Sequence, residues 1–170
     1  ARVEAGNTLA PRGRFLLDPF NKDRATVSGI TGLAVETENN RPSHIAFFAG
    51  RVFYVGIESD KINGHIFFSQ VITKLDRVGK CYQEADPTTE EINELIDSDG
   101  GVVVIPEIGN IKGTFVTDRF LILFADNGIW SISGSGDDAF KATNFAVSRL
   151  SKVGCVSGDS IVNAAGITYY

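Results

Sequence analysis

Apolar residues along the chain come in short runs separated by glycine-containing turns. One pair of runs spans 43–57 and turns at Gly50, and a second spans 119–134 and turns at Asn127-Gly128. Asn-Gly between two apolar runs is among the strongest short signals for a β-hairpin. These patterns predict an all-β fold that consists mainly of antiparallel hairpins.

Further segments extend this pattern. A strand is expected after Asn63-Gly64, and a third hairpin is expected over 160–170 with its turn at Ala165-Gly166. The interval from Gly50 to Gly128 matches two repeats of about 40 residues, and that from Gly128 to Gly166 matches one. A repeat of this length is the size of a four-stranded propeller blade. We therefore expect propeller-like blades.

Adjacent aromatic pairs indicate sheets that are buried on both faces. Phe47-Phe48 and Phe67-Phe68 each lie within an apolar run. Neighbouring side chains of a strand point to opposite faces of the sheet, so one phenylalanine of each pair faces each side. This arrangement is typical of stacked propeller sheets or of a packed subunit interface.

One short helix is expected near 87–96. Thr88 and Glu91 have the spacing of a capping box, and Pro87 suits a first helical turn. Ile92 and Ile96 lie on one face of such a helix, which would cover a sheet. The Asp97-Ser98-Asp99-Gly100 stretch that follows is expected to end the helix.

The chain is interpreted as one β-rich region over residues 1–170, in which 1–40 form a less regular N-terminal connection. The sequence begins at Ala1, lacks Met, and stops at Tyr170 inside an apolar run. We therefore expect a piece of a longer protein. No apolar run reaches the ~18 residues that a membrane span needs.

Charge and cysteine content exclude several function classes. The net charge is −5 and the pI about 5.0, which disfavours a nucleic-acid grip, because such a grip needs a basic face. Cys81 and Cys155 are far apart and form no CxxC pair. We expect buried, reduced thiols rather than a disulfide framework or a zinc site.

No motif supports catalysis, a cofactor or a metal, so the prediction is a non-enzyme. His44 and His65 each begin an apolar run, without a nucleophile placed near them. The segment 134–139 matches only the loosest dinucleotide pattern and is interpreted as a polar hairpin connection, before a strand-like 140–147. The segment 97–108 lacks the calcium-loop ligands at its fifth and twelfth positions.

The stretch 124–130 resembles the Asp-box of sialidase-like propellers. It has Phe124 where Ser or Thr is usual, and Trp130 comes one residue early. An alternative function is therefore a carbohydrate-binding or glycan-degrading β-propeller adhesin. In that case Trp130 and Tyr170 would be exposed and would stack on sugars.

Several stretches in succession resemble the tail nozzle (tail tubular protein B) family of short-tailed bacteriophages, the podoviruses. The resemblance covers about 12–170, and its order and rough spacing agree with the family. Its main stretches are Ala46–Gly56, Gly64–Gln70, Cys81–Glu90 with Asp99–Gly101, Leu123–Trp130 and Val147–Gly154.

The resemblance implies a virion structural protein, located in the phage tail and assembled in the host cytoplasm. It implies a homo-hexameric ring that joins the tail adaptor and the tail fibre or other tail proteins. Phage DNA would pass through the channel without specific binding, and no small-molecule substrate or catalytic residue comes with the family. We expect acidic loops, Glu90–Glu94 or Asp137-Asp138, to face this channel, because like charge avoids adhesion to the DNA backbone.

Overall fold

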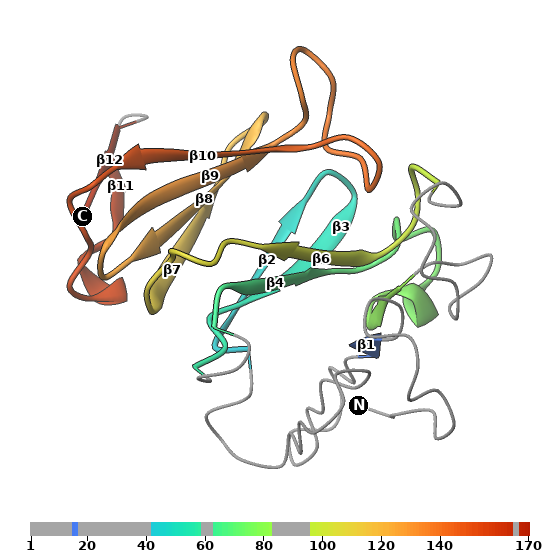
Figure 1. Ribbon diagram of the computed structural model, residues 1–170, viewed down its shortest axis with the longest axis horizontal. Coiled ribbons are helices and arrows are strands. Elements are labelled where there is room, and N and C mark those ends of the chain that lie inside the picture. Colours follow the sequence, from blue (N-terminus) through green and yellow to red (C-terminus); the bar gives the residue numbers. More distant parts are fainter. Residues whose placement is uncertain (1–14, 17–41, 59–62, 83–95, 165–166) are drawn as a thin grey trace.

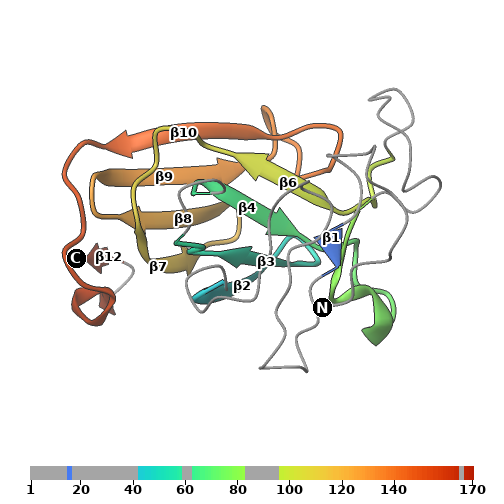
Figure 2. The ribbon, with the colours of Figure 1, turned by 60° about the horizontal axis from the view of Figure 1, so that its bottom comes forward.

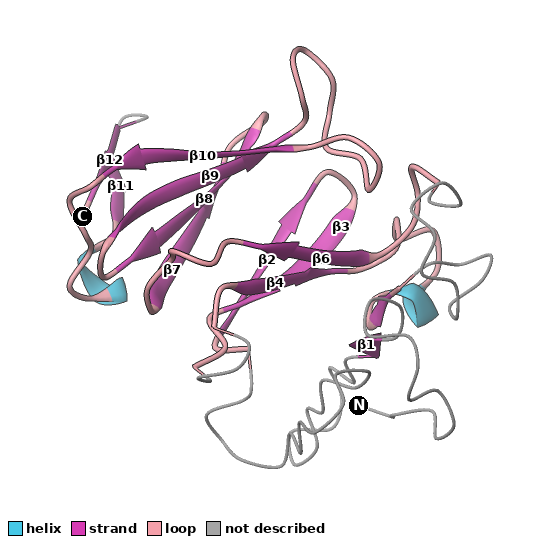
Figure 3. Ribbon diagram, viewed as in Figure 1, coloured by secondary structure: helices cyan, strands magenta, loops and turns pink. Residues whose placement is uncertain are grey.

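The structure, a computed structural model, describes residues 15–16, 42–58, 63–82, 96–164 and 167–170. This part of the chain is all-β, as predicted (Figures 1 and 3). Short 3-10 helices at Leu75–Arg77 and Gly158–Ser160 are its helical elements. Its strands are β1 (Phe15–Leu16), β2 (His44–Phe48), β3 (Arg51–Val55), β4 (His65–Phe68), β5 (Lys80–Cys81), β6 (Gly101–Val104), β7 (Ile111–Val116), β8 (Phe120–Ala125), β9 (Gly128–Ser133), β10 (Ala146–Ser151), β11 (Val162–Ala164) and β12 (Ile167–Tyr169).

The first sheet contains four antiparallel strands in the order β2-β3-β4-β6. The β2–β3 hairpin turns at Ala49 and Gly50, whose φ angles of 49° and 72° are both positive. A two-residue turn with two positive φ angles matches the right-handed twist of the flanking strands, and this explains the glycine. The hairpin predicted around Gly50 is confirmed.

The second sheet is an uninterrupted antiparallel meander in the order β7-β8-β9-β10. Its β8–β9 hairpin turns at Asp126-Asn127 and pairs Ala125 with Gly128, as the Asn-Gly signal predicted. The segment 134–145 connects β9 to β10, in agreement with the polar connection expected at 134–139. Residues 140–145 are not strand, and β10 begins only at Ala146, because Lys141 and Asn144 form a tight turn of their own.

The two sheets pack face to face around one hydrophobic core. Strands β2 and β7, the first strands of the two sheets, lie next to each other (Figures 1 and 2). The core residues are Ala46, Phe48, Phe53, Val55, Ile66, Phe68, Val103, Ile105, Ile108, Ile111, Leu121, Leu123, Ala125, Trp130, Ile132, Phe140 and Ala142.

Phe140 joins the second sheet to the aromatic part of the first. It lies in the β9–β10 connection, and its ring is edge-on to Phe53 and to Phe68, each at 5.1 Å between centroids. Phe48 lies 6.2 Å away from it. Such tilted and edge-to-face contacts are the favoured geometry of aromatic pairs.

The outer faces of both sheets carry smaller apolar clusters. Tyr54, Ile57, Phe67 and Cys81 form one on the first sheet. Phe124, Ile129 and Cys155 form the other on the second sheet, next to the start of the C-terminal β11–β12 hairpin. This hairpin confirms the one predicted over 160–170, although its turn at 165–166 lies outside the described residues.

The repeat inferred from turn glycines is wrong, because Gly50 joins the first and second strands of its sheet whereas Gly128 begins the third strand of the other. The helix expected near 87–96 and the connection expected over 1–40 fall almost entirely outside the described residues. Ile96, at the end of that helix, is not helical in the described part.

Candidate interaction surface

The residues with catalytic or metal-binding potential lie apart in the fold. His44 begins β2, where its Nδ1 lies 2.8 Å from the hydroxyl of Ser43, and His65 begins β4. No group of three or more His, Cys, Asp or Glu that could hold a metal occurs in the described residues. Cys81 and Cys155 are both buried and unbridged, and burial raises the pKa of the Cys81 thiol.

The turn that resembles an Asp-box is fixed by hydrogen bonds within the chain. Asn127 Oδ1 accepts from the Gly109 amide and Asn127 Nδ2 donates to the Glu107 carbonyl, both at 2.8 Å. Asp126 Oδ1 accepts from the Asn110 amide at 3.1 Å. These polar side chains therefore attach the β8–β9 turn to the linker between the two sheets.

Trp130 is a core residue rather than a sugar-binding platform. Only 1% of its surface is exposed, and the Arg149 guanidinium covers its ring at 4.8 Å from the centroid. Tyr170 is 44% exposed and lies 5.4 Å from the Phe124 ring. Of the two aromatic residues proposed for sugar stacking, only Tyr170 is thus available in this fold.

Arg51 is the most unusual buried polar residue. It is only 1% exposed, and its guanidinium donates to the main-chain carbonyls of Asp97, Ser98, Asp99 and Ser69. It also lies 5.6 Å from the Phe68 ring centroid and 5.8 Å from that of Phe140. Desolvation by burial lowers its pKa to about 10, partly offset by the nearby aspartates. Arg51 therefore fixes the 97–99 turn against the first sheet.

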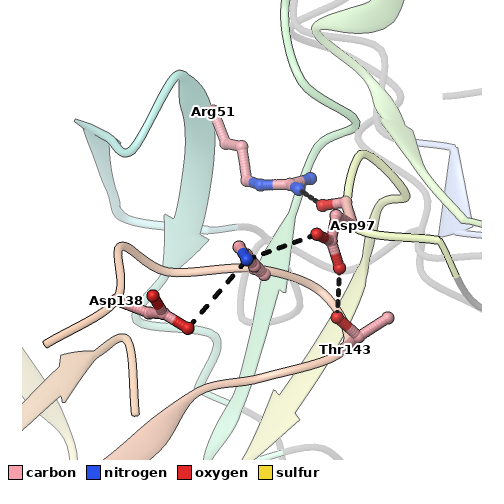
Figure 4. A network of polar contacts seen from close by, with 5 residues as sticks. Arg51, Asp97, Asp138 and Thr143 are labelled. Carbon is pink, nitrogen blue, oxygen red and sulfur yellow. Dashed lines mark hydrogen bonds and ion pairs between the residues drawn. The ribbon is translucent and has the colours of Figure 1, made fainter. Parts of the chain in front are cut away.

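The same turn is connected to the β9–β10 connection through the Asp97 side chain. The Thr143 hydroxyl donates to Asp97, and Lys141 Nζ lies 3.5 Å from Asp97 and 4.0 Å from Asp138 (Figure 4). The Thr143 hydrogen bond, followed by the charge of Lys141, lowers the pKa of Asp97. The network thus ties the two sheets together at one edge.

The outer face of the first sheet presents large apolar side chains to solvent. Ile45 and Phe47 on strand β2 are 69% and 63% exposed. They point away from the shared core, whereas Ala46 and Phe48 on the same strand point into it. The opposite orientation predicted for the two phenylalanines is confirmed. The prediction that both faces are buried is wrong at Phe47, which the described residues leave uncovered, and is confirmed at Phe67 and Phe68 on β4.

A second set of exposed apolar residues lies at the other end of the stack. The C-terminal hairpin beyond the second sheet exposes Val162, Ile167, Tyr169 and Tyr170, and Val156 precedes it. Large exposed apolar patches mark interaction sites in soluble proteins. We call Ile45 and Phe47 the β2 patch and Val162, Ile167, Tyr169 and Tyr170 the hairpin patch.

Of the two acidic stretches expected to face a channel, one is described. Asp137 and Asp138 are exposed in the β9–β10 connection, and Asp137 pairs with Arg119 at 3.0 Å. Glu90–Glu94 lies outside the described residues.

Within the part of the chain that the structure describes, no helix has the length and hydropathy that a membrane span requires.

Sequence reasoning did not single out Arg51 and so missed its buried role. A signal was present, because strand alternation places Arg51 on the same face as Phe53 and Val55. The apolar exposure of Ile45 could not be read in this way, since it depends on what lies above the sheet.

No protein-family model, curated protein or solved structure matches the chain.

Proposed function

We propose that the protein is a virion structural protein, a subunit of a bacteriophage tail nozzle ring through which DNA is ejected. The observation that carries the proposal is a stack of two four-stranded sheets with exposed apolar patches at both ends. The sequence resemblance to podovirus nozzles adds the identity of the assembly. The proposed site of action is the phage tail.

The two patches suit repeated contacts between subunits or between neighbouring tail proteins. The β2 patch and the hairpin patch differ in residues and lie on different sheets, so a contact between them joins two different surfaces. Contacts between two different surfaces of one subunit generate rings when the rotation closes. A homo-hexamer that also binds the tail adaptor and the fibre or other tail proteins is the form we propose.

The charge of the chain suits passage of DNA rather than its capture. A net charge of −5 provides little to neutralise phosphates, and electrostatic affinity for DNA grows with the number of phosphates neutralised. In the proposed ring the β9–β10 connection, with Asp137 and Asp138, faces the channel. DNA would then pass without specific binding.

Cryo-electron microscopy of the particles that contain this chain tests the proposal directly. We expect density for the chain in a symmetric ring around an axial channel. Density for a monomer or for a peripheral appendage would overturn the proposal. A glycan array would then be the next experiment, since the sugar-binding alternative predicts such an appendage.

A further inference from the structure

The sequence contains two Asn-Gly pairs, at Asn63-Gly64 and Asn127-Gly128, and the fold treats them very differently. Asn-Gly is the dipeptide most prone to spontaneous deamidation, because glycine has no Cβ to shield its amide nitrogen. We propose that Asn63 is a site of spontaneous deamidation and isoaspartate formation in the folded protein, whereas the fold protects Asn127.

The reaction needs only water as a co-reactant. The Gly64 amide nitrogen attacks Asn63 Cγ, a new C–N bond forms, and the side-chain amide leaves as ammonia after taking up the proton of the Gly64 amide. Water then opens the resulting succinimide at one of its two carbonyls. The product is either aspartate or isoaspartate, and no oxidation or reduction occurs.

Asn127 is held away from this reaction by both ends of its side-chain amide. Its Oδ1 accepts from the Gly109 amide and its Nδ2 donates to the Glu107 carbonyl. Its main-chain carbonyl also accepts from Arg149 Nη2 at 2.6 Å. Attack by Gly128 requires the side chain to rotate and both of its hydrogen bonds to break, so we expect it to react about tenfold more slowly than Asn63.

Asn63 lacks this restraint. It is exposed in the turn before β4, and none of the described residues forms a hydrogen bond with its side chain. Gly64 adopts a φ of 79°, a conformation that side chains rarely adopt. The turn therefore retains glycine, whose amide nitrogen has no neighbouring Cβ, and this buried glycine directly follows an exposed asparagine.

Modification at this turn would reach the edge of the first sheet. The Gly64 carbonyl accepts from the Ile105 amide at 2.9 Å, just beyond the end of β6. A Cβ at Gly64 would lie only 2.3 Å from the Ile105 carbonyl oxygen, so the two main chains are closely packed. Isoaspartate adds one carbon to the main chain at residue 63 and should disturb this contact.

The test is to incubate the full chain at mildly alkaline pH and follow both sites by peptide mapping with mass spectrometry. We expect Asn63 to convert about tenfold faster than Asn127 in the folded protein. In concentrated urea the two rates should become similar, because both sites are then unrestrained Asn-Gly pairs. Aged protein should also show faster hydrogen exchange at the Ile105 amide.

The variant Asn63→Gln is the matched control, because glutamine forms the corresponding ring far more slowly. It should lose the isoaspartate signal at residue 63 and keep the protection of Ile105 on ageing. The proposal is overturned if the folded protein converts Asn127 as fast as Asn63. It is equally overturned if Asn63 converts in urea but remains intact in the folded chain.

Discussion

At the residue scale, Arg51 shows how a charged side chain can be accommodated in an aromatic core. Its guanidinium has several donors in a fixed planar arrangement, and here these donors meet main-chain carbonyls rather than a carboxylate. The Asp97 and Ser98 carbonyls also accept from the amides of Ala142 and Val71, whereas Arg51 is the donor to the Asp99 and Ser69 carbonyls. Removing only one side of such an arrangement leaves buried acceptors unsatisfied.

Replacing Arg51 with Met should therefore destabilise the protein. Loss of hydrogen bonds from a charged donor predicts a decrease of about 3 kcal/mol in the free energy of unfolding, measured by urea denaturation. Arg119→Met provides the control, because Arg119 is exposed and, among the described residues, pairs with exposed Asp137 alone. That change should cost no more than about 0.5 kcal/mol. Equal effects of the two substitutions would contradict the role given to Arg51.

At the element scale, the register of β2 separates two adjacent phenylalanines by function. Phe48 faces the core and contacts the rings of Phe53 and Phe140, whereas Phe47 lies in the exposed β2 patch. The two residues are the same amino acid at adjacent positions of one strand. They therefore form a matched pair that distinguishes core packing from surface association.

Phe48→Ala should lower the free energy of unfolding by about 3–5 kcal/mol, since it removes a buried aromatic side chain. Phe47→Ala should change the unfolding of the isolated chain by less than about 1 kcal/mol, because that ring is already largely solvated. In analytical ultracentrifugation, Phe47→Ala should instead weaken any self-association. If Phe47→Ala proves as destabilising as Phe48→Ala, the orientation of β2 is wrong.

The link between the 97–99 turn and the β9–β10 connection should be sensitive to acid. The pKa of Asp97 in the folded protein lies below its ordinary value of 3.8, mainly because Thr143 donates a hydrogen bond to the carboxylate. A carboxylate with a lowered pKa contributes stability that is present above 3.8 and is lost as the pH falls through the folded-state pKa.

Thermal unfolding of the wild type and of Asp97→Asn, followed across this acidic range, measures that contribution. The wild type should lose more stability than the variant as the pH falls. Thr143→Val should flatten the acid response in the same direction, because it removes the main cause of the lowered pKa. Parallel curves for wild type and both variants would show that this link contributes nothing to acid sensitivity.

The hairpins at Gly50 and Asn127-Gly128 were predictable, because turn chemistry and alternation are local. The assignment of those two glycines to equivalent places in a repeat failed, because it depends on which strands pair over long distances. The role of Arg51 was likewise missed, since it depends on contacts between segments far apart in the sequence.

At the scale of the whole molecule, the stacked sheets leave apolar surface at two ends and acidic side chains in one loop. The proposed ring uses the first for contacts between subunits and the second to line the channel. The contribution of Asp137 and Asp138 is reduced by their neighbours Arg119 and Lys141. A change in the sign of the charge of this loop therefore requires both acidic side chains to be replaced at once.

The double substitution Asp137→Lys/Asp138→Lys should slow DNA ejection from assembled particles, because the two new lysines would gather beside Lys141 of the same loop and Arg119 of the β7–β8 turn. Ejection rates can be followed with a DNA-binding dye after receptor triggering. Glu107→Lys/Asp159→Lys makes the same change in charge at the opposite end of the second sheet and should leave the rate unaltered. Unchanged ejection in the first variant would remove this loop from the channel.

The position of Phe140 in the sequence affects the order in which the fold forms. During synthesis on the ribosome the first sheet is complete long before Phe140 emerges, and its rings at Phe53 and Phe68 then lack their edge-on partner. Contacts between residues so distant in sequence close slowly, and apolar surface exposed in the meantime favours aggregation. A chaperone would therefore matter most in the period after the first sheet is synthesised and before Phe140 emerges.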